Sequence, residues 1–524
     1  MQAAGQDILI GIDAGTSVIK SIAFDLAGRQ IAAASVPNRY TTRPDGAAFQ
    51  PLAQTWDDCA RTLRDLASRV PNLATRTAAI AVTAQGDGTW LVGKGNQPVT
   101  DGWIWLDARA ASTARTLSAL PTDPGRFAAT GTGLNACQMG TQLAYMQATT
   151  PDLLDRAEVS LHPKDWLYLN LTGIRATDPS EASFTFGNFR TRAYDAAVID
   201  ALGLTTRRNL LPEIIDGSQT SHPLSAAAAT QTGLLQGTPV SLGYVDVVCT
   251  AMGAGIYTGP GTQAGCTIIG STGMHMRATP AQDVRLGITP TGYVMTLPIP
   301  GMVAQLQSNM AATLNIDWAL RLAGDLLAEL GQPVAQADLI ARIEGWLQHS
   351  QAGAMLYHPY ISDAGERGPF VNSDARAGFI GLNSSHRFPD LIRAVIEGLG
   401  LAARDCYAAM GPIPTEVRLT GGAARSSGLR AILSAAVGAP TRISAREEAG
   451  AAGAAMMAAV ANGVYPSIQS CLDEWVTPHL GQPENPDPAL VKTYNRLFPT
   501  YLAARQALPP VWDRLAKHQD NENG

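Results

Sequence analysis

The chain has 524 residues, a formal net charge of −6 and only 16% charged residues. One compact core rarely reaches this length, so the sequence predicts two large domains. The acidic balance argues against a general nucleic-acid binder, and six scattered cysteines without a Cys-x-x-Cys pair argue against a disulfide framework or a thiolate zinc site.

The N-terminus, MQAAGQDILI, lacks the basic start and the long apolar core of a signal peptide. No run of about 18 strongly apolar residues occurs farther along the chain. We therefore expect a cytoplasmic protein with no membrane partner.

The first predicted element is a β-hairpin. Residues 8–12 and 18–24 are short β-branched runs, and the sequence DAGTS at 13–17 lies between them. This pattern is typical of two antiparallel strands joined by a tight turn. A second turn at 26–29 predicts a third antiparallel strand.

The DAGTS turn has the chemistry of an anion site. Gly15 permits a positive φ, and Thr16 and Ser17 place hydroxyls beside exposed backbone N–H groups. Lys20 can add a positive charge. Taken alone, the stretch is equally compatible with an ordinary β-meander that carries an aspartate at a turn.

Strands and helices then alternate. Over 52–70, apolar residues recur at steps of four and three, which predicts a helix with one buried face. Residues 77–93 return to strand character, interrupted by the Gly-Asp-Gly sequence at 86–88. This alternation favours an α/β domain.

A Gly- and Pro-rich stretch at 257–265 marks the predicted domain boundary and divides the chain into domains 1–256 and 257–524. After it, an apolar strand and a hydroxyl-bearing turn at 270–273 repeat the pattern of the first hairpin. Two domains that each offer a phosphate-holding hairpin would face each other across a cleft.

The region 416–440 predicts a strand, a Gly-Gly turn and a helix. A further helix over 447–462 consists mostly of small residues, and we expect it to pack closely against the preceding helix. Two common nucleotide folds are disfavoured. No Gly-x-x-x-x-Gly-Lys-Ser/Thr sequence occurs, and the Gly-x-Gly patterns at 131–133 and 253–255 lack the context of a dinucleotide fold.

The order of these features resembles the FGGY carbohydrate kinases over nearly the whole chain. Six motifs carry the resemblance: DAGTS at 13–17, WLDAR at 105–109, PKDWL at 163–167, GYVDVVCTAMGAG at 243–255, GERGPFVNSDARAGFIGL at 365–382 and LTGGAARS at 419–426. The resemblance implies two α/β domains of the actin-like, ribonuclease-H-like ATPase fold with a cleft between them. It also implies ATP and Mg²⁺ as cofactors.

By this resemblance, Asp246 is the general base that accepts the proton of the attacking hydroxyl. The run DVVCTAMGAG predicts a helix that begins at Asp246, and a helix N-terminus favours the carboxylate form. We therefore expect an ionised base at neutral pH. The alternative is that Asp246 is a simple N-cap.

The resemblance also implies the residues that hold the metal and the nucleotide. Asp13 is similar to the family residue that positions Mg²⁺, usually through water. Thr16, Ser17 and Lys20 would contact the β- and γ-phosphates. The remaining contacts to the phosphates and the adenosine would come from Ser271, Gly421, Gly422 and Ala423.

The acceptor is expected near Gln85, Asp87, Trp105 and Asp246, because carboxylates and amides pair with hydroxyls and an indole offers a flat apolar wall. The sequence AQGDGTW lacks the Arg-Glu of glycerol kinases and the Met-His-Gly of xylulose kinases. Within the family, the chain is most similar to kinases that convert erythritol to erythritol 4-phosphate. The expected partner is thus a small polyol, with a homodimer as one possible assembly.

Two motifs are interpreted as scaffold. Asp107 and Arg109 favour a salt bridge that orients the Trp105 loop, and Asp165 and Trp166 favour a structural role.

Other functions remain open at this point. Xylulose, ribulose, threitol or glycerol could be the acceptor. An actin-like ATPase that switches a protein partner would keep the phosphate hairpins but would not need Asp87, Trp105 and Asp246 around a small pocket. A polyol sensor without phosphoryl transfer would need neither Asp13 nor Asp246.

Overall fold

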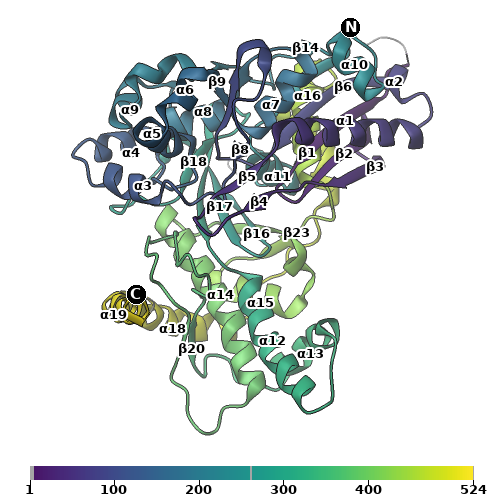
Figure 1. Ribbon diagram of the computed structural model, residues 1–524. Helices are drawn as coiled ribbons and strands as arrows, with labels where there is room; N and C mark the ends of the chain where they lie inside the picture. The colour runs from purple at the N-terminus through teal and green to yellow at the C-terminus, as the bar shows by residue number, and fades with distance from the viewer. Residues whose placement is uncertain (1–4, 260–262, 523–524) are drawn as a thin grey trace.

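The computed structural model describes residues 5–259 and 263–522. It contains two domains, each built around a six-stranded mixed sheet, which confirms the predicted α/β fold. Figure 1 shows the N-terminal domain at the top and most of the C-terminal half below it. Across the described part of the chain, no helix combines the length and the apolarity needed to cross a bilayer.

The N-terminal sheet contains both hairpins predicted at the start of the chain. In spatial order its strands are β14 (His222–Pro223), β15 (Pro239–Leu242), β6 (Thr77–Ala84), β1 (Ile8–Ala14), β2 (Val18–Asp25) and β3 (Gln30–Pro37). Strand β1 is antiparallel to β2 and parallel to β6, and β2 is antiparallel to β3. The DAGTS turn therefore lies at the end of the central strand β1.

The predicted amphipathic helix is α1 (Leu52–Arg69), which packs against β2 and β3. Its apolar positions Trp56, Cys59, Leu63 and Leu66 are buried, as the spacing predicted. Removing this stripe from water stabilises the outer half of the sheet.

The C-terminal sheet repeats this plan. Its strands, in spatial order, are β18 (Tyr293–Thr296), β19 (Met302–Asn309), β17 (Gly273–Pro280), β16 (Ala264–Ile269), β22 (Glu416–Thr420) and β23 (Thr441–Ile443). Strand β16 is antiparallel to β17 and parallel to β22, as β1 is to β2 and β6. The weak sequence echo between the two hairpins is thus confirmed as a structural repeat.

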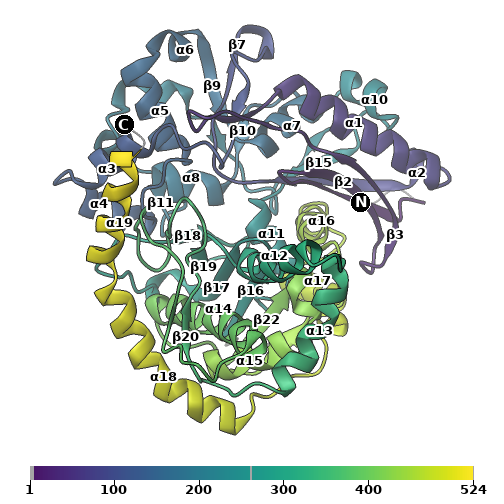
Figure 2. The same cartoon turned by 60° about the horizontal axis from the view of Figure 1, so that its bottom comes forward.

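The helices of the C-terminal half lie around this second sheet. Helix α14 (Phe388–Met410) packs on β17 and β19, and α15 (Ser427–Val437) packs on α14. The hairpin-like pair α12 (Thr313–Glu329) and α13 (Gln336–Gln348) lies at the far end in Figure 1. Figure 2 shows α18 (Pro488–Ala507) running along the outer side of this half.

The small-residue helix predicted at 447–462 is α16 (Ala449–Ala461). The prediction that it packs against the preceding helix, α15, was wrong. It packs against α11 (Asp246–Ala254) and strands β1 and β6 of the N-terminal sheet instead of α15. In Figure 1 this late segment lies within the upper domain. The chain therefore returns to the first domain after building the second.

Glycines set the distance between α11 and α16. A Cβ on Gly453 would lie 2.1 Å from the carbonyl oxygen of Cys249, and a Cβ on Gly253 would lie 2.1 Å from that of Ala449. The two backbones therefore touch directly, and no larger residue fits at either glycine.

The predicted boundary stretch 257–265 begins after α11 and includes the first two residues of β16. Residues 260–262 of this stretch lie outside the described residues. The division into 1–256 and 257–524 stays a prediction, and α16 shows that residues beyond 257 also complete the first domain.

Gly453→Ala should destabilise the fold. The added methyl collides with backbone, so the two helices must separate, and overpacking of this kind costs about 1–3 kcal/mol. Urea denaturation measures the free energy of unfolding. The matched control is Gly345→Ala in α13, where a Cβ meets nothing within 4 Å and should stabilise by up to about 1 kcal/mol. Equal effects of the two changes would contradict this account.

Candidate active site

A cavity of about 200 Å³ lies between the two domains. The four residues predicted to surround the acceptor, Gln85, Asp87, Trp105 and Asp246, all line it. They come from two loops, at 85–87 and around Trp105, and from the start of α11, and they are 161 positions apart at most, so the fold alone brings them together. A cavity with a few convergent polar groups is the usual form of a small-molecule site.

Three polar side chains on the N-terminal wall are linked to one another. The indole nitrogen of Trp105 donates to the hydroxyl of Thr16 at 2.7 Å, and Thr16 donates to Gln85 Oε1 at 2.8 Å. Gln85 in turn donates to Gln50 at 2.7 Å. Thr16, which the resemblance assigned to the phosphates, therefore lies at the junction between the DAGTS turn and the acceptor cavity.

Asp87 is held in an unusual position. Its φ is 57°, a left-handed conformation that few residues other than glycine adopt without strain. Its Oδ2 accepts from the hydroxyl of Tyr293 at 3.0 Å and from the thiol of Cys137 at 3.5 Å. Its Oδ1 is buried and has no hydrogen-bond partner among the described residues. This oxygen is available to accept from a hydroxyl of a bound molecule.

The opposite wall comes from the C-terminal domain, and sequence reasoning missed it. Tyr293 on β18 donates across the cleft to Asp87 and packs edge-to-face on Phe184, with ring centroids 5.4 Å apart. Arg367 also lines the cavity, and its Nε donates to Ser308 Oγ at 2.8 Å. The GERGPF motif contained Arg367, but nothing in its local pattern pointed to this cavity. Tyr293 had no sequence signal at all.

Apolar groups complete the cavity. Phe184, Met274, Met295 and Leu306 contribute side chains from both domains. Together with the Trp105 indole, they provide an apolar surface for a short carbon chain, while the polar groups set its orientation.

Asp246 begins α11, as predicted, and its Oδ1 accepts from the N–H of Val247 at 2.7 Å. Burial, aided by the nearby Asp13 carboxylate, raises the pKa of Asp246 to about 8. The expectation of an ionised base at neutral pH is therefore wrong for the protein alone. Desolvation penalises the charge more than the helix N-terminus favours it.

Asp13 lies at the end of β1, where burial raises the pKa of its carboxyl to about 6. Asp13 lies against α16 at Gly450, where an added Cβ would lie 2.4 Å from Asp13 Oδ2. No group of three or more His, Cys, Asp or Glu residues that could hold a metal occurs within residues 5–259 and 263–522. Asp13 and Asp246, whose carboxyl groups are near enough to interact electrostatically, would fit a hydrated Mg²⁺ that keeps most of its water ligands.

Lys20 pairs with the residue that precedes α16. Its Nζ lies 2.9 Å from Glu448 Oε2, just before α16. The predicted phosphate contact would therefore require Lys20 to share its charge between Glu448 and the nucleotide. Ser17, the other hydroxyl of the turn, is exposed.

The residues predicted to hold the nucleotide lie on the C-terminal side of the cleft. Gly421 has a φ of 95°, and a Cβ there would lie 2.4 Å from the carbonyl oxygen of Ile269. The Gly-Gly turn thus touches the end of β16, just before the second hairpin turn. Ser271, Gly421 and Gly422 are exposed, and Ala423 is half-buried. They form an accessible surface of backbone and small side chains.

The salt bridge interpreted as scaffold is confirmed. Arg109 Nη2 lies 2.6 Å from Asp107 Oδ2, and the same carboxylate oxygen accepts from the N–H of Ala48 at 2.9 Å. The Arg109 guanidinium also lies 3.4 Å from the centre of the Trp103 ring. These contacts fix the loop that carries Trp105.

Two family descriptions match the sequence. The N-terminal domain of the FGGY family of carbohydrate kinases matches residues 8–253, and the C-terminal domain of the same family matches residues 265–462. The chain belongs to the FGGY family of carbohydrate kinases.

Relatives of this FGGY kinase agree with the assignment. It is 66% identical to the erythritol kinase of Brucella abortus (strain 2308), over 97% of this chain and 98% of the relative. It is 27% identical to the xylulose kinase of Escherichia coli (strain K12), over 96% and 99% of the two chains. This protein is therefore an ATP-dependent carbohydrate kinase.

The fold of the FGGY kinase is also found in solved structures. The gluconate kinase from Lactobacillus acidophilus matches with a TM-score of 0.87 at 20% identity, covering 97% of this chain and 99% of that one. At this identity the match shows the fold alone. The two-domain α/β architecture implied by the resemblance is thereby confirmed.

The raised pKa of Asp246 predicts how stability depends on pH. Between about pH 4 and pH 8, the folded protein keeps a proton that the unfolded chain loses, so the free energy of unfolding falls as pH rises. Asp246→Asn cannot ionise, so the variant does not lose this stability as pH rises. The variant should therefore exceed the parent by at least about 1.4 kcal/mol near pH 8, with the difference vanishing near pH 4. Urea denaturation across this range measures it, and parallel curves for the two proteins would contradict it.

Proposed function

We propose that this kinase transfers the γ-phosphate of ATP to a terminal hydroxyl of erythritol, giving erythritol 4-phosphate in the cytoplasm. The 66% identity to an erythritol kinase supports the acceptor. The observation in the structure that carries the proposal is the cavity in which the unpartnered Oδ1 of Asp87 and the half-buried Asp246 share one small space.

The residues of the cavity suit a short polyol. Asp87 accepts from one hydroxyl, and Gln85 offers an amide beside it. The Trp105 indole is locked by its hydrogen bond to Thr16, so its face is a fixed wall for the carbon chain. A site held in this way binds the acceptor with little loss of side-chain freedom.

In the proposed mechanism, Asp246 accepts the proton of the terminal hydroxyl as its oxygen forms a bond to the γ-phosphorus. The bond from that phosphorus to the bridging oxygen breaks, and ADP leaves with the electron pair. A pKa near the working pH allows Asp246 to take the proton and later release it. Mg²⁺ held by Asp13 would neutralise phosphate charge and, by adding positive charge nearby, favour the ionised form of Asp246.

The first test is ADP release by the purified protein with Mg-ATP and a panel of acceptors. Erythritol should support the fastest turnover, above threitol, glycerol, xylulose, ribulose, ribitol and xylitol. Asp246→Asn should reduce turnover with erythritol by a factor of about 10² or more, because general-base assistance is lost. A pentose as the best acceptor would overturn the proposed substrate but keep the family. Acceptor-independent ATP hydrolysis, unchanged in Asp246→Asn, would favour the ATPase switch.

Asp87→Asn tests the acceptor contact. The amide can keep one hydrogen bond with Tyr293 or with the polyol, but not both in the same geometry, so KM for erythritol should rise about tenfold or more. The KM for ATP should stay close to its original value. Steady-state kinetics with each substrate varied in turn measures both constants. The matched control is Asp283→Asn, outside the cavity, and a rise in KM for both substrates with Asp87→Asn would contradict an acceptor contact.

A further inference from the structure

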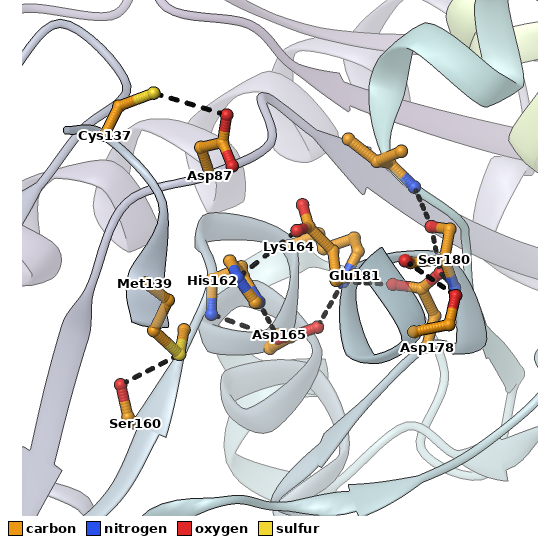
Figure 3. Close-up of polar contacts among 12 residues, drawn as sticks. Asp87, Cys137, Met139, Ser160, His162, Lys164, Asp165, Asp178, Ser180 and Glu181 are labelled. Carbon is orange, nitrogen blue, oxygen red and sulfur yellow. Dashed lines mark hydrogen bonds and ion pairs between the residues drawn. The ribbon is translucent and has the colours of Figure 1, made fainter. Parts of the chain in front are cut away.

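A cluster of buried charges lies behind the N-terminal wall of the cavity. It consists of His162, Lys164, Asp165, Asp178 and Glu181, and none of these residues is more than 3% exposed. We call it the α8 charge cluster, because two of its members lie at the start of α8 (Pro179–Phe186). Figure 3 shows these side chains converging beneath the segment that carries Asp87. The proposed mechanism assigns no role to any of them.

Lys164 is the centre of the cluster. Its Nζ lies 2.5 Å from Asp165 Oδ1 and 2.6 Å from Asp178 Oδ2. Burial raises the pKa of Asp165, but the contacts of Lys164 and His162 together outweigh this effect and leave that pKa below its usual value. The contact between Lys164 Nζ and Asp178 Oδ2 therefore holds the Asp178 side chain in place.

Such a cluster needs an explanation beyond stability. Well-packed apolar residues are often as stabilising as buried ion pairs, because burial removes the charges from water. The contacts between the cluster and residues outside it therefore indicate what the cluster does. One of them leads directly to the start of α11.

Ser180 makes this connection. Its hydroxyl donates to Asp178 Oδ1, and its oxygen accepts from the backbone N–H of Val245 at 3.2 Å. A carboxylate can only accept, so Asp178 obliges the Ser180 hydroxyl to donate to it and leaves a lone pair free for Val245. Val245 immediately precedes Asp246 and has no side-chain cap of its own.

A second contact reaches the acceptor loop. A Cβ on Gly86, between Gln85 and Asp87, would lie 3.0 Å from Glu181 Oε1. Burial raises the pKa of Glu181 well above its usual range, so a negative charge on this side chain is disfavoured beside the loop. The first turn of α8 thus supports both the loop that carries Gln85 and Asp87 and the start of α11.

We propose that Ser180 is a positioning residue for phosphoryl transfer, and that the chain Lys164, Asp178, Ser180 and Val245 N–H holds the start of α11 so that Asp246 faces the acceptor hydroxyl. The Lys164 pair fixes Asp178, Asp178 orients Ser180, and Ser180 fixes the backbone next to the base. This inference rests on the proposed role of Asp246. It assigns a role in phosphoryl transfer to Ser180, a residue that does not touch the reacting atoms.

The test is Ser180→Ala, assayed with Mg-ATP and erythritol. Misplacing a reacting group by about 1 Å costs up to about 10²-fold, so kcat should fall about ten- to hundredfold. KM for each substrate should stay within about twofold, because the acceptor and nucleotide contacts are untouched. Ser183→Ala is the matched control, since Ser183 is buried on the same helix and its hydroxyl donates to the carbonyl of Ser180. Its kcat should not change.

A double-mutant cycle separates positioning from general loosening. If Ser180 acts through Asp246, then Ser180→Ala should cause no further loss of the residual rate in an Asp246→Asn background. The same fold loss in both backgrounds would overturn the proposal, as would an unchanged kcat in Ser180→Ala. Ser180→Cys fills the same space with a weaker acceptor and provides a second variant, for which kcat should also fall.

The two proposals can fail separately. Full turnover by Asp246→Asn would refute the assignment of the base. Loss of turnover in Asp246→Asn, combined with normal turnover in Ser180→Ala and Ser180→Cys, would refute only the role of Ser180.

Discussion

The direct backbone contact between α11 and α16 is the constraint on which the site depends. Gly253 and Gly453 allow each helix to touch the other without an intervening side chain. Helix α16 also packs on β1, whose last but one residue is Asp13, while α11 begins at Asp246. One helix from late in the sequence therefore holds both carboxylates in place, and wider spacing would move them relative to the cleft.

This arrangement places two carboxyl groups where their ionisation is unfavourable. Burial raises the pKa of both Asp13 and Asp246, and the Asp13 carboxylate raises the pKa of Asp246 further. The burial of apolar side chains in the surrounding core compensates for this unfavourable contribution to stability. Functional sites commonly contain groups that reduce stability, and here these are the two groups that we propose attract a cation and accept a proton.

Local patterns were enough to predict the hairpins, α1, the start of α11 and the four residues on the N-terminal side of the cavity. Each depends on a short run of residues and on the resemblance to a family. The partner of α16 could not be predicted, because a helix of small residues packs closely against any complementary surface. Tyr293 was missed because its role depends on a contact with Asp87, 206 positions away. The protonation of Asp246 was mispredicted because desolvation is a property of the folded molecule.

The hydrogen bond from Tyr293 to Asp87 joins the two domains inside the cavity. If the two domains moved apart, Asp87 would lose its donor from the second domain, and water could solvate the carboxylate instead. The groups proposed to recognise the acceptor are thus complete only while the two domains are in contact. Selectivity for the acceptor is consequently shared by both halves of the molecule, and a change of preferred polyol would require compatible substitutions in two domains that are distant in sequence.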